Sequence, residues 1–203
     1  MRAADAQRYA GQYMSVVYIS PQHVSTDLVG ASIEKKLEIF EAQVKGWLLD
    51  HAHALSLNSY PPSKHAGISI LALCLVYVEA IACFINGQTS DGKSKAFFKD
   101  GLIAIFPEYS SALHKYSDDF YREVRCGLIH QGMTRGKIGI CQDSINPIEI
   151  HDSTGIFEFA MINPWLFLDR VHQHFDRYLA DARNPANTTL RHNFEVWFDN
   201  RPA

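Results

Sequence analysis

An almost unbroken apolar run constrains the fold more than any other feature of the sequence. Residues 68–85 read ISILALCLVYVEAIACFI and contain a single charged side chain, Glu79. The run is long enough to span a bilayer, but a carboxylate inside a membrane costs about 2.5 kcal/mol or more, and no cluster of Lys or Arg flanks it. We therefore expect a central buried helix of a soluble cytoplasmic chain, and no membrane association.

Hydrophobic spacing elsewhere predicts further helices. Apolar residues recur at helical intervals over residues 32–56, with Ser32 in the capping position, and over residues 109–130, where Gly132 ends the pattern. A short helix ends at Pro107, and Asn163 followed by Pro164 begins a helix that ends before Asn184. Short apolar runs between residues 137 and 161 predict a small antiparallel hairpin or meander. The chain is thus predicted to be mainly α with a small antiparallel β insertion.

The length favours one domain. A chain of 203 residues, 47% of them hydrophobic, holds one sizeable core. We expect a single domain over residues 1–203, with a helical core at about 32–182, an N-terminal arm at 1–31 and a C-terminal tail at 184–203. In the arm, we expect a short strand or an extended arm at residues 12–20, QYMSVVYIS. In the tail, we expect a short strand or a docking segment at residues 194–198, FEVWF.

Composition excludes several classes of protein. The formal net charge is −3, which disfavours a protein that coats nucleic acid nonspecifically, although a local basic site remains compatible with it. Four cysteines without a CxxC pair indicate a reducing compartment rather than a zinc finger. His51 with His53, and His172 with His174, are spaced i,i+2, which places the two rings on different sides of a helix and disfavours metal binding. We expect no metal and no cofactor.

Glu79 is the first chemically informative residue. A buried carboxylate either takes up a proton or pairs with a cation, and the third long helix offers Arg122 and Arg125. In one interpretation the pair is structural and fixes the register of two helices. In the other, Glu79 orients an arginine that has a function.

Arg125 and His130 lie in the stretch FYREVRCGLIHQGMTRG, residues 120–136. Five residues along an ideal helix separate the two side chains by about 140° around the axis and about 7.5 Å along it. One helix alone does not make them neighbours, so a shared site requires a second copy of the chain.

These residue types suit RNA cleavage. Attack by a 2′-hydroxyl requires that one proton be removed and another be given to the leaving 5′-oxygen, and histidine titrates close enough to neutrality for either task. Arginine stabilises the developing negative charge without losing its own proton. The reaction itself needs no metal.

The helical layout, Glu79 in the second long helix and REVRCGLIHQG near the end of the third resemble the HEPN superfamily. The resemblance covers residues 32–182 and implies a four-helix bundle. It also implies a homodimeric, metal-independent ribonuclease of toxin–antitoxin, phage-defence or RNA-processing systems. The family's R-x4-6-H motif falls on Arg125 and His130, and its supporting acidic residue falls on Glu79. Many active members carry a polar residue after the arginine, where this chain has Cys126.

Neighbouring residues complete the predicted site. Arg122, Arg135 and Lys137 are candidates for binding flanking phosphates, with a solvated turn as the alternative for the last two. Tyr121 or Tyr109 could stack on a base, although tyrosine at such positions is more often partly buried core. Cysteine nucleophile chemistry at Cys126 is disfavoured because no base is paired with it.

The sequence therefore predicts an RNA-cleaving homodimer with Arg125, His130 and Glu79 as catalytic residues. The alternative is an inactive HEPN-like module that binds a nucleotide or a partner protein such as an antitoxin. Cys126 favours the module, and the group of basic residues favours the enzyme. The RNA substrate, the partner and the pathway are not specified by the sequence.

Overall fold

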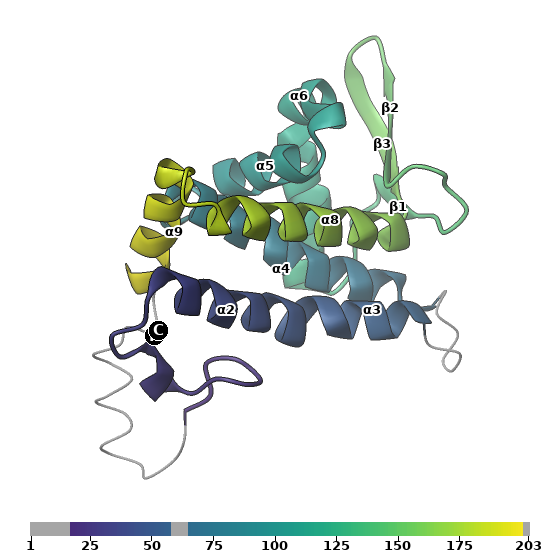
Figure 1. The fold of residues 1–203 in the computed structure, drawn as a ribbon. Coiled ribbons are helices and arrows are strands. Elements are labelled where there is room, and N and C mark those ends of the chain that lie inside the picture. The colour runs from purple at the N-terminus through teal and green to yellow at the C-terminus, as the bar shows by residue number, and fades with distance from the viewer. Residues whose placement is uncertain (1–16, 58–64, 201–203) are drawn as a thin grey trace. The chain divides into compact units, whose positions relative to one another are not determined.

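The computed structural model describes residues 17–57 and 65–200. These residues are mainly helical and include one three-stranded sheet (Figure 1). The predicted class, mainly α with a small β insertion, is confirmed. The QYMSVVYIS segment falls largely outside the described residues, and of its remainder Tyr18 forms an isolated antiparallel bridge with Val24.

The elements of the first half of the chain are short 3-10 and π segments (η) and α-helices: η1 (Ser25–Leu28), α2 (Ile33–Val44), η2 (Lys45–Leu49), α3 (Asp50–Leu57), α4 (Gly67–Asn86) and α5 (Ser94–Ile105). Those of the second half are η4 (Pro107–Tyr109), α6 (Ser110–Phe120), η5 (Tyr121–Arg125), α7 (Cys126–Gln131), β1 (Ile138–Ile140), β2 (Ile148–Ser153), β3 (Ile156–Ile162), α8 (Pro164–Arg183) and α9 (Thr188–Asn200).

The chain divides into two compact units. Unit 1 comprises residues 1–50, 83–89 and 175–203, and unit 2 comprises residues 51–82 and 90–174. Unit 1 is built around Phe40 of α2. Its ring centroid lies 4.1 Å from that of Phe84 and 5.6 Å from those of Phe175 and Phe194. Aromatic side chains bury large apolar areas, so this cluster is the main source of hydrophobic stabilisation in unit 1.

Unit 2 holds most of α4 together with α5, α6, the sheet and the first half of α8. Phe106 packs on Phe167 of α8 with ring centroids 4.7 Å apart. Phe157 of β3 lies 5.5 Å from Tyr116 and 6.0 Å from Phe120, which fixes one face of the sheet against α6. The start of α8 is capped as predicted, since the Asn163 side chain accepts hydrogen bonds from the backbone N–H groups of the next turn.

Both long amphipathic helices contain a π-helical turn. Residues 33–57 are helical throughout but pass through η2, and residues 107–131 pass through η5. A π turn inserts one extra residue, which shifts the buried stripe of a helix around its axis. The predicted helices are confirmed, whereas their π turns carry no signal in the hydrophobic pattern.

Two predictions need correction. The sheet is not wholly antiparallel: β2 and β3 form the expected hairpin, closed by a two-residue turn in which Thr154 and Gly155 have φ of 51° and 86°, but β1 pairs with β3 in parallel. FEVWF is not a strand, because it lies inside α9. There Phe194 and Phe198 are both buried at a spacing of four residues, which is the period of a helix. The five-residue window viewed alone has the alternation of a strand.

Helix α4 has the length and hydropathy of a membrane span, and among the described residues it is the one helix that does. Within its most apolar 18-residue window, 56% of the residues are buried inside the protein. Core helices of soluble proteins pass the same test, so this feature is weak support for a membrane span.

A close helix contact in unit 2 gives a test of the packing. A Cβ atom added at Gly101 of α5 would lie 1.8 Å from the carbonyl oxygen of Val78 in α4. Gly→Ala in an open helix stabilises by up to about 1 kcal/mol. Here we expect Gly101→Ala to destabilise by about 1–3 kcal/mol, because the two helices must separate. Chemical denaturation monitored by circular dichroism measures this change. Gly136→Ala is the control, since its Cβ would meet nothing within 4 Å; equal stability of the two variants would contradict the close approach.

Candidate active site

Glu79 and Arg125 form an ion pair in unit 2. The Arg125 Nη2 atom donates to Glu79 Oε2 at 3.1 Å, and the two side chains are 23% and 17% exposed. Of the two arginines expected from the sequence, the partner is therefore Arg125. Because both groups are largely shielded from water, their attraction is screened less than that of a surface pair. The pair joins α4 to η5.

The guanidinium of Arg125 is held on a second side by Tyr121. The guanidinium carbon lies 5.5 Å from the centroid of the Tyr121 ring, which in turn packs edge-on against Phe98 at 5.7 Å. A cation over an aromatic face is stabilised by the ring quadrupole. Tyr121 was predicted to bind substrate; in the structure its ring contacts Arg125 and Phe98.

Arg122 is committed to carboxylates of its own helix. Its Nη2 atom donates to Asp119 at 2.6 Å, and its Nε atom donates to Glu123 at 2.7 Å. These hydrogen bonds, that to Glu123 foremost and then that to Asp119, raise the pKa of Arg122 above its ordinary value. Glu123 is buried rather than solvated, so removing Arg122 would leave a carboxylate without its main partner. Arg122 uses two of its five N–H groups in these bonds and its side chain is 50% exposed, so three donors remain for a phosphate.

The segment after α7 folds back along the helix. Gly132 ends α7 with φ of 71°, and the backbone N–H of Arg135 then donates to the Glu123 carbonyl at 2.9 Å. This return requires Gly127, since a Cβ there would lie 2.7 Å from the Met133 carbonyl oxygen. The side chain of Arg135 reaches Gln131, with Nε 3.3 Å from Oε1. Arg135 is thus placed beside α7.

Lys137 and Tyr109 contact residues outside the Glu79–Arg125 pair. Lys137 donates from Nζ to the Phe157 carbonyl at 3.1 Å, with Nζ 5.6 Å from the Phe157 ring. Tyr109 contacts Phe106 at 6.4 Å between ring centroids, and partial burial raises the pKa of its hydroxyl. Lys137 therefore belongs to the sheet, and Tyr109 belongs to the junction before α6.

His130 is exposed near the end of α7. It follows Arg125, the last residue of the π turn η5, by five residues that all lie in α7. In ideal α-helical geometry this spacing puts the two side chains about 140° apart around the axis. The exposed side of η5 and α7 between them carries Cys126 and Ile129. One chain therefore brings together Arg125, Glu79 and Tyr121, and it leaves His130 open on an adjacent side of the helix.

Asp119 and Gly127 were not anticipated, whereas Glu123, which the sequence places on a solvated face or as a partner within its own helix, is buried and pairs with Arg122. Asp119 and the buried Glu123 neutralise Arg122, and Gly127 admits the returning loop. The sequence carried a signal for two of them: Asp119 lies three residues before Arg122, and a glycine stands in the middle of a predicted helix. Burial of Glu123 depends on the loop that covers it, so it had no local signal.

Three of the four histidines in the two i,i+2 pairs make contacts in unit 2. His53 and His172 meet edge-to-face with ring centroids 6.1 Å apart, and His174 Nδ1 lies 2.8 Å from the Tyr77 hydroxyl. Within residues 17–57 and 65–200, no group of three or more His, Cys, Asp or Glu side chains is arranged to hold a metal ion.

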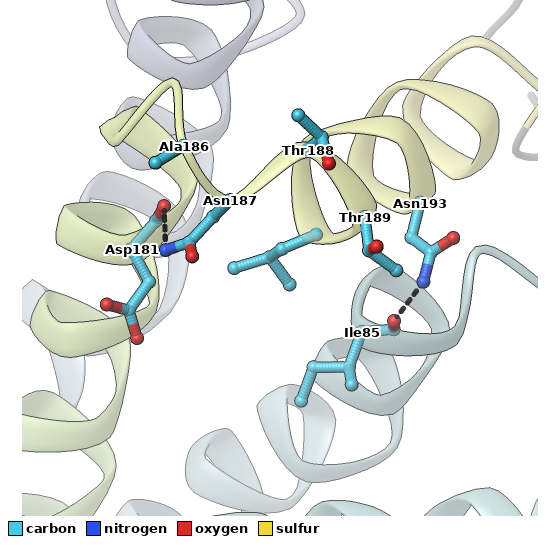
Figure 2. Close-up of a pocket in the computed structure, with 8 residues that line it drawn as sticks. Ile85, Asp181, Ala186, Asn187, Thr188, Thr189 and Asn193 are labelled. Carbon is cyan, nitrogen blue, oxygen red and sulfur yellow. Dashed lines mark hydrogen bonds between the residues drawn. The ribbon is translucent and has the colours of Figure 1, made fainter.

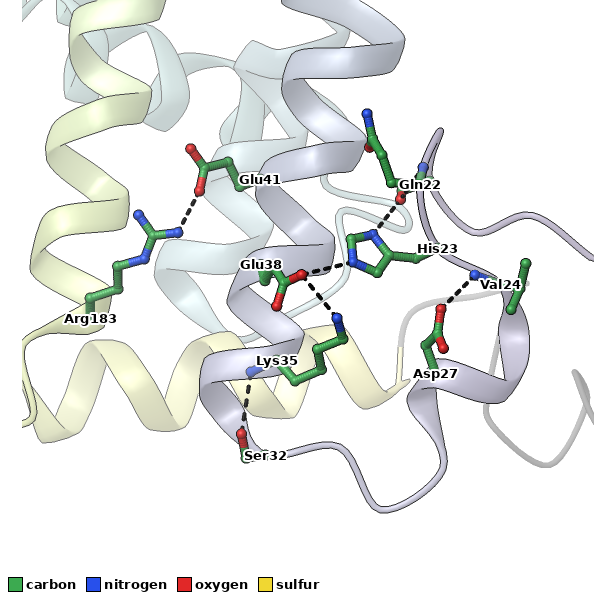
Figure 3. A network of polar contacts seen from close by, with 10 residues as sticks. Gln22, His23, Val24, Asp27, Ser32, Lys35, Glu38, Glu41 and Arg183 are labelled. Carbon is green, nitrogen blue, oxygen red and sulfur yellow. Dashed lines mark hydrogen bonds and ion pairs between the residues drawn. The ribbon is translucent and has the colours of Figure 1, made fainter.

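A second polar cluster lies in unit 1 (Figure 3). Ser20 Oγ is 2.7 Å from His23 Nδ1, and His23 Nε2 is 3.0 Å from Glu38 Oε1, which also accepts from Lys35. The order serine, histidine, acid is that of a hydrolase triad, but Ser20 is fully buried, which closes it to a substrate. Hydrogen bonds from Lys35 and then from His23 hold the pKa of Glu38 below its usual range. The cluster ties the segment before η1 to α2.

A pocket of about 490 Å³ lies in unit 1 where α8 turns into α9 (Figure 2). Its lining includes Asp181, Asn187, Thr188, Thr189 and Asn193. Two of the polar side chains are already used, since Asn187 donates to the Asp181 carbonyl at 2.9 Å and Asn193 donates to the Ile85 carbonyl at 2.7 Å. These bonds close the turn, which gives the residues a structural role.

Comparison with known proteins found no relative. No protein-family model matches the chain, and neither a curated protein nor a solved structure does so. The function must therefore be argued from the site.

Removing the carboxylate of Glu79 tests whether the ion pair stabilises unit 2. Glu79→Gln leaves the guanidinium of Arg125 without its charged partner, and we expect a loss of about 1–3 kcal/mol in unfolding free energy. Urea denaturation of Glu79→Gln, Arg125→Met and the double variant gives the coupling energy between the two sites. Glu158→Gln, at an exposed position, is the matched control and should change stability by less than about 0.5 kcal/mol. A coupling energy of zero would show that the pair contributes nothing.

Proposed function

We propose that the chain is a metal-independent endoribonuclease of the HEPN type, with a HEPN-like helical bundle and an active site shared by two copies of the chain. The observation that carries the proposal is the shielded Glu79–Arg125 pair, with the exposed imidazole of His130 less than two turns further along the same helix. A guanidinium fixed in place and an imidazole open to solvent are the two groups that cleavage by a 2′-hydroxyl needs.

Each side chain has a distinct task in this proposal. His130 moves a proton at the attacking 2′-oxygen or at the leaving 5′-oxygen, because imidazole exchanges protons near neutral pH. Arg125 binds the phosphate oxygens on which negative charge accumulates. Glu79 and Tyr121 act through Arg125, since they contact its guanidinium from two sides and restrict its orientation.

A second copy is part of the proposal because of the angle between the two side chains. At about 140° around one helix axis, Arg125 and His130 do not converge on a single phosphate. Two copies that meet across η5 and α7 would bring the arginine of one chain toward the histidine of the other.

An open apolar surface next to the site supports such a dimer. On α4, the outward stripe that contains Glu79 also contains Ala72, Leu73, Ala80 and Val76, which is 49% exposed. Ile129 of α7 is 54% exposed, and Met133 is 57% exposed. The Glu79–Arg125 pair links the helix that carries the α4 stripe to the turn that precedes α7. Exposed apolar side chains grouped in this way are typical of a protein–protein interface.

The second candidate is a module without catalytic activity that binds a nucleotide or a partner protein. Two observations favour it. Cys126 follows Arg125 where a polar residue is expected, and Asp119, Glu123 and Glu79 neutralise much of the local positive charge. Both candidates use the same surface, and they differ in whether RNA is cut.

The mechanism makes a direct prediction for His130. His130→Ala should reduce RNA cleavage by at least about 100-fold, because proton transfer by a positioned side chain contributes that much or more. Cleavage of a 5′-labelled RNA in the presence of EDTA, followed on denaturing gels, measures the rate without a free divalent metal.

His114→Ala is the matched control, since His114 is an exposed histidine on α6 within the same run of helix. It should cleave at the wild-type rate, and circular dichroism should show both variants folded. Full activity of folded His130→Ala would refute the mechanism. A wild-type chain that binds RNA without cutting it would favour the module.

The dimer can be tested through Val76. Val76→Lys places a charge in the middle of the proposed interface, so the dimer should dissociate at concentrations where the wild type is dimeric. Light scattering coupled to size-exclusion chromatography measures the mass. Ile145→Lys adds the same charge at a side chain that is 87% exposed and lies outside the stripe, and it should leave the dimer intact. A monomeric wild type would rule out the shared site.

A further inference from the structure

The β2–β3 hairpin of unit 2 has an apolar outer face. The face that packs on α6 carries Ile148, Ile150, Phe157, Ala160 and Ile162, most of them buried. The opposite face carries His151, Phe159 and Met161 along β2 and β3. Phe159 is 40% exposed, and Ile156 near the turn is 67% exposed. Figure 1 shows β2 and β3 continuing as a two-stranded ribbon beyond the short β1.

Two local features direct these apolar side chains outward. His151 pairs with Phe159 while Asp152 pairs with Phe157, so Glu158 is an extra residue on β3 and forms a β-bulge. The bulge lets Phe157 point inward and Phe159 outward, although the two are only two residues apart. On β1, Gly139 leaves room for Met161, because a Cβ there would lie 2.5 Å from the Met161 sulfur.

The outer face holds a preformed aromatic pair. The rings of His151 and Phe159 are stacked, with centroids 4.2 Å apart and planes 12° from parallel. Their mutual contact reduces the freedom of both side chains, so a partner that packs on them loses less entropy on binding.

The outer edge of β2 has unused backbone groups. On β3, Ala160 and Ile162 bond toward β1, and Asn163 bonds to Pro147 on the other side. Alternation along an antiparallel ladder then turns the N–H and C=O groups of Ile150, which is only partly buried, away from β3. Those of Ile148 point the same way but are closed to solvent, because Ile148 is 1% exposed. No hydrogen bond to these groups is recorded within residues 17–57 and 65–200. An exposed edge of this type accepts an additional strand.

The surface is acidic. Residues 148–162 contain Glu149, Asp152 and Glu158 and no Lys or Arg. The nearest lysines are engaged, since Lys115 pairs with Asp152 at 3.4 Å and Lys137 bonds to the Phe157 carbonyl. Phosphates would be repelled here. A second copy of the same edge would also place like charges opposite each other, which destabilises strand pairing.

We propose that the β2 edge and the adjoining outer face dock an extended segment of a partner protein in which Lys or Arg residues alternate with β-branched residues. Backbone hydrogen bonds to Ile150 supply affinity, and the carboxylates of Glu149 and Glu158 select the basic side chains. The apolar side chains of the segment pack beside His151 and Phe159. The surface is separate from Arg125 and His130, and the proposal stands whether or not the chain cuts RNA.

The test uses the ¹⁵N-labelled full chain and three probes: a nine-residue peptide of alternating Val and Lys, its Val–Glu counterpart, and a single-stranded RNA nonamer. The Val–Lys peptide should shift the amide signal of Ile150 saturably and slow its hydrogen exchange. The Val–Glu peptide should leave both unchanged. Equal binding of both peptides, shifts confined to other surfaces, or RNA binding at the hairpin would each overturn the proposal.

Two variants complete the test. Ile150→Pro removes an outward N–H group that makes no bond within the hairpin, a position where proline is tolerated, and it should weaken binding at least about tenfold. Glu158→Lys reverses one exposed charge and should weaken Val–Lys binding about fivefold while keeping the edge intact. The proposal is wrong if neither variant changes the affinity for the Val–Lys peptide. If Ile150→Pro does not fold, unchanged affinity of folded Glu158→Lys is enough to reject it.

Discussion

The rest of unit 2 depends on how the charge of Glu79 is satisfied. A carboxylate on an apolar core helix needs a partner, because desolvating an unpaired charge costs several kcal/mol. Arg125 supplies that partner, and its reach across from η5 sets how η5 and α7 lie along α4. Tyr121 and Phe98 then hold the guanidinium from a second side. The same contacts that stabilise the unit also fix the direction of the one cation that the proposed chemistry requires.

Carboxylates neutralise more of the basic side chains near the Glu79–Arg125 pair than the sequence suggests. Arg122 is clamped by Asp119 and Glu123, and Arg135 lies along α7 where Gly127 admits the returning loop. The local field is therefore modest, and a bound phosphate would interact mainly with Arg125. This arrangement suits selective positioning of a single phosphate better than strong, nonspecific attraction of nucleic acid. The β2–β3 hairpin differs, because its carboxylates repel phosphates. Its outer strand edge is the place where we propose that a peptide docks.

Much of the helical framework was predictable, because hydrophobic spacing is a local property. The helices at residues 33–57, 67–86, 94–105, 107–131 and 164–183 follow from their apolar stripes and from caps such as Asn163 and Gly132. The pairing of Glu79 with an arginine followed from the cost of burying a charge. Short segments were less predictable: FEVWF alternates like a strand, yet Phe194 and Phe198 pack on the Phe40 cluster only as a helix. The parallel pairing of β1 depended on contacts with β3 made at long range.

By itself, the sequence determined which residues carry charge or bury apolar surface, and it determined where the helices other than α9 lie, since those choices rest on side chains within a few residues of each other. The tertiary structure alone decided that Arg125 rather than Arg122 meets Glu79, that Glu123 is buried beneath the loop after α7, and that Phe159 and Phe157 lie on opposite faces of the hairpin. Each of these outcomes depends on a π turn, a bulge or a returning loop, which shifts a side chain to another face of its element. Such shifts are fixed by packing against segments far away in the chain, and that information is not present in any local pattern.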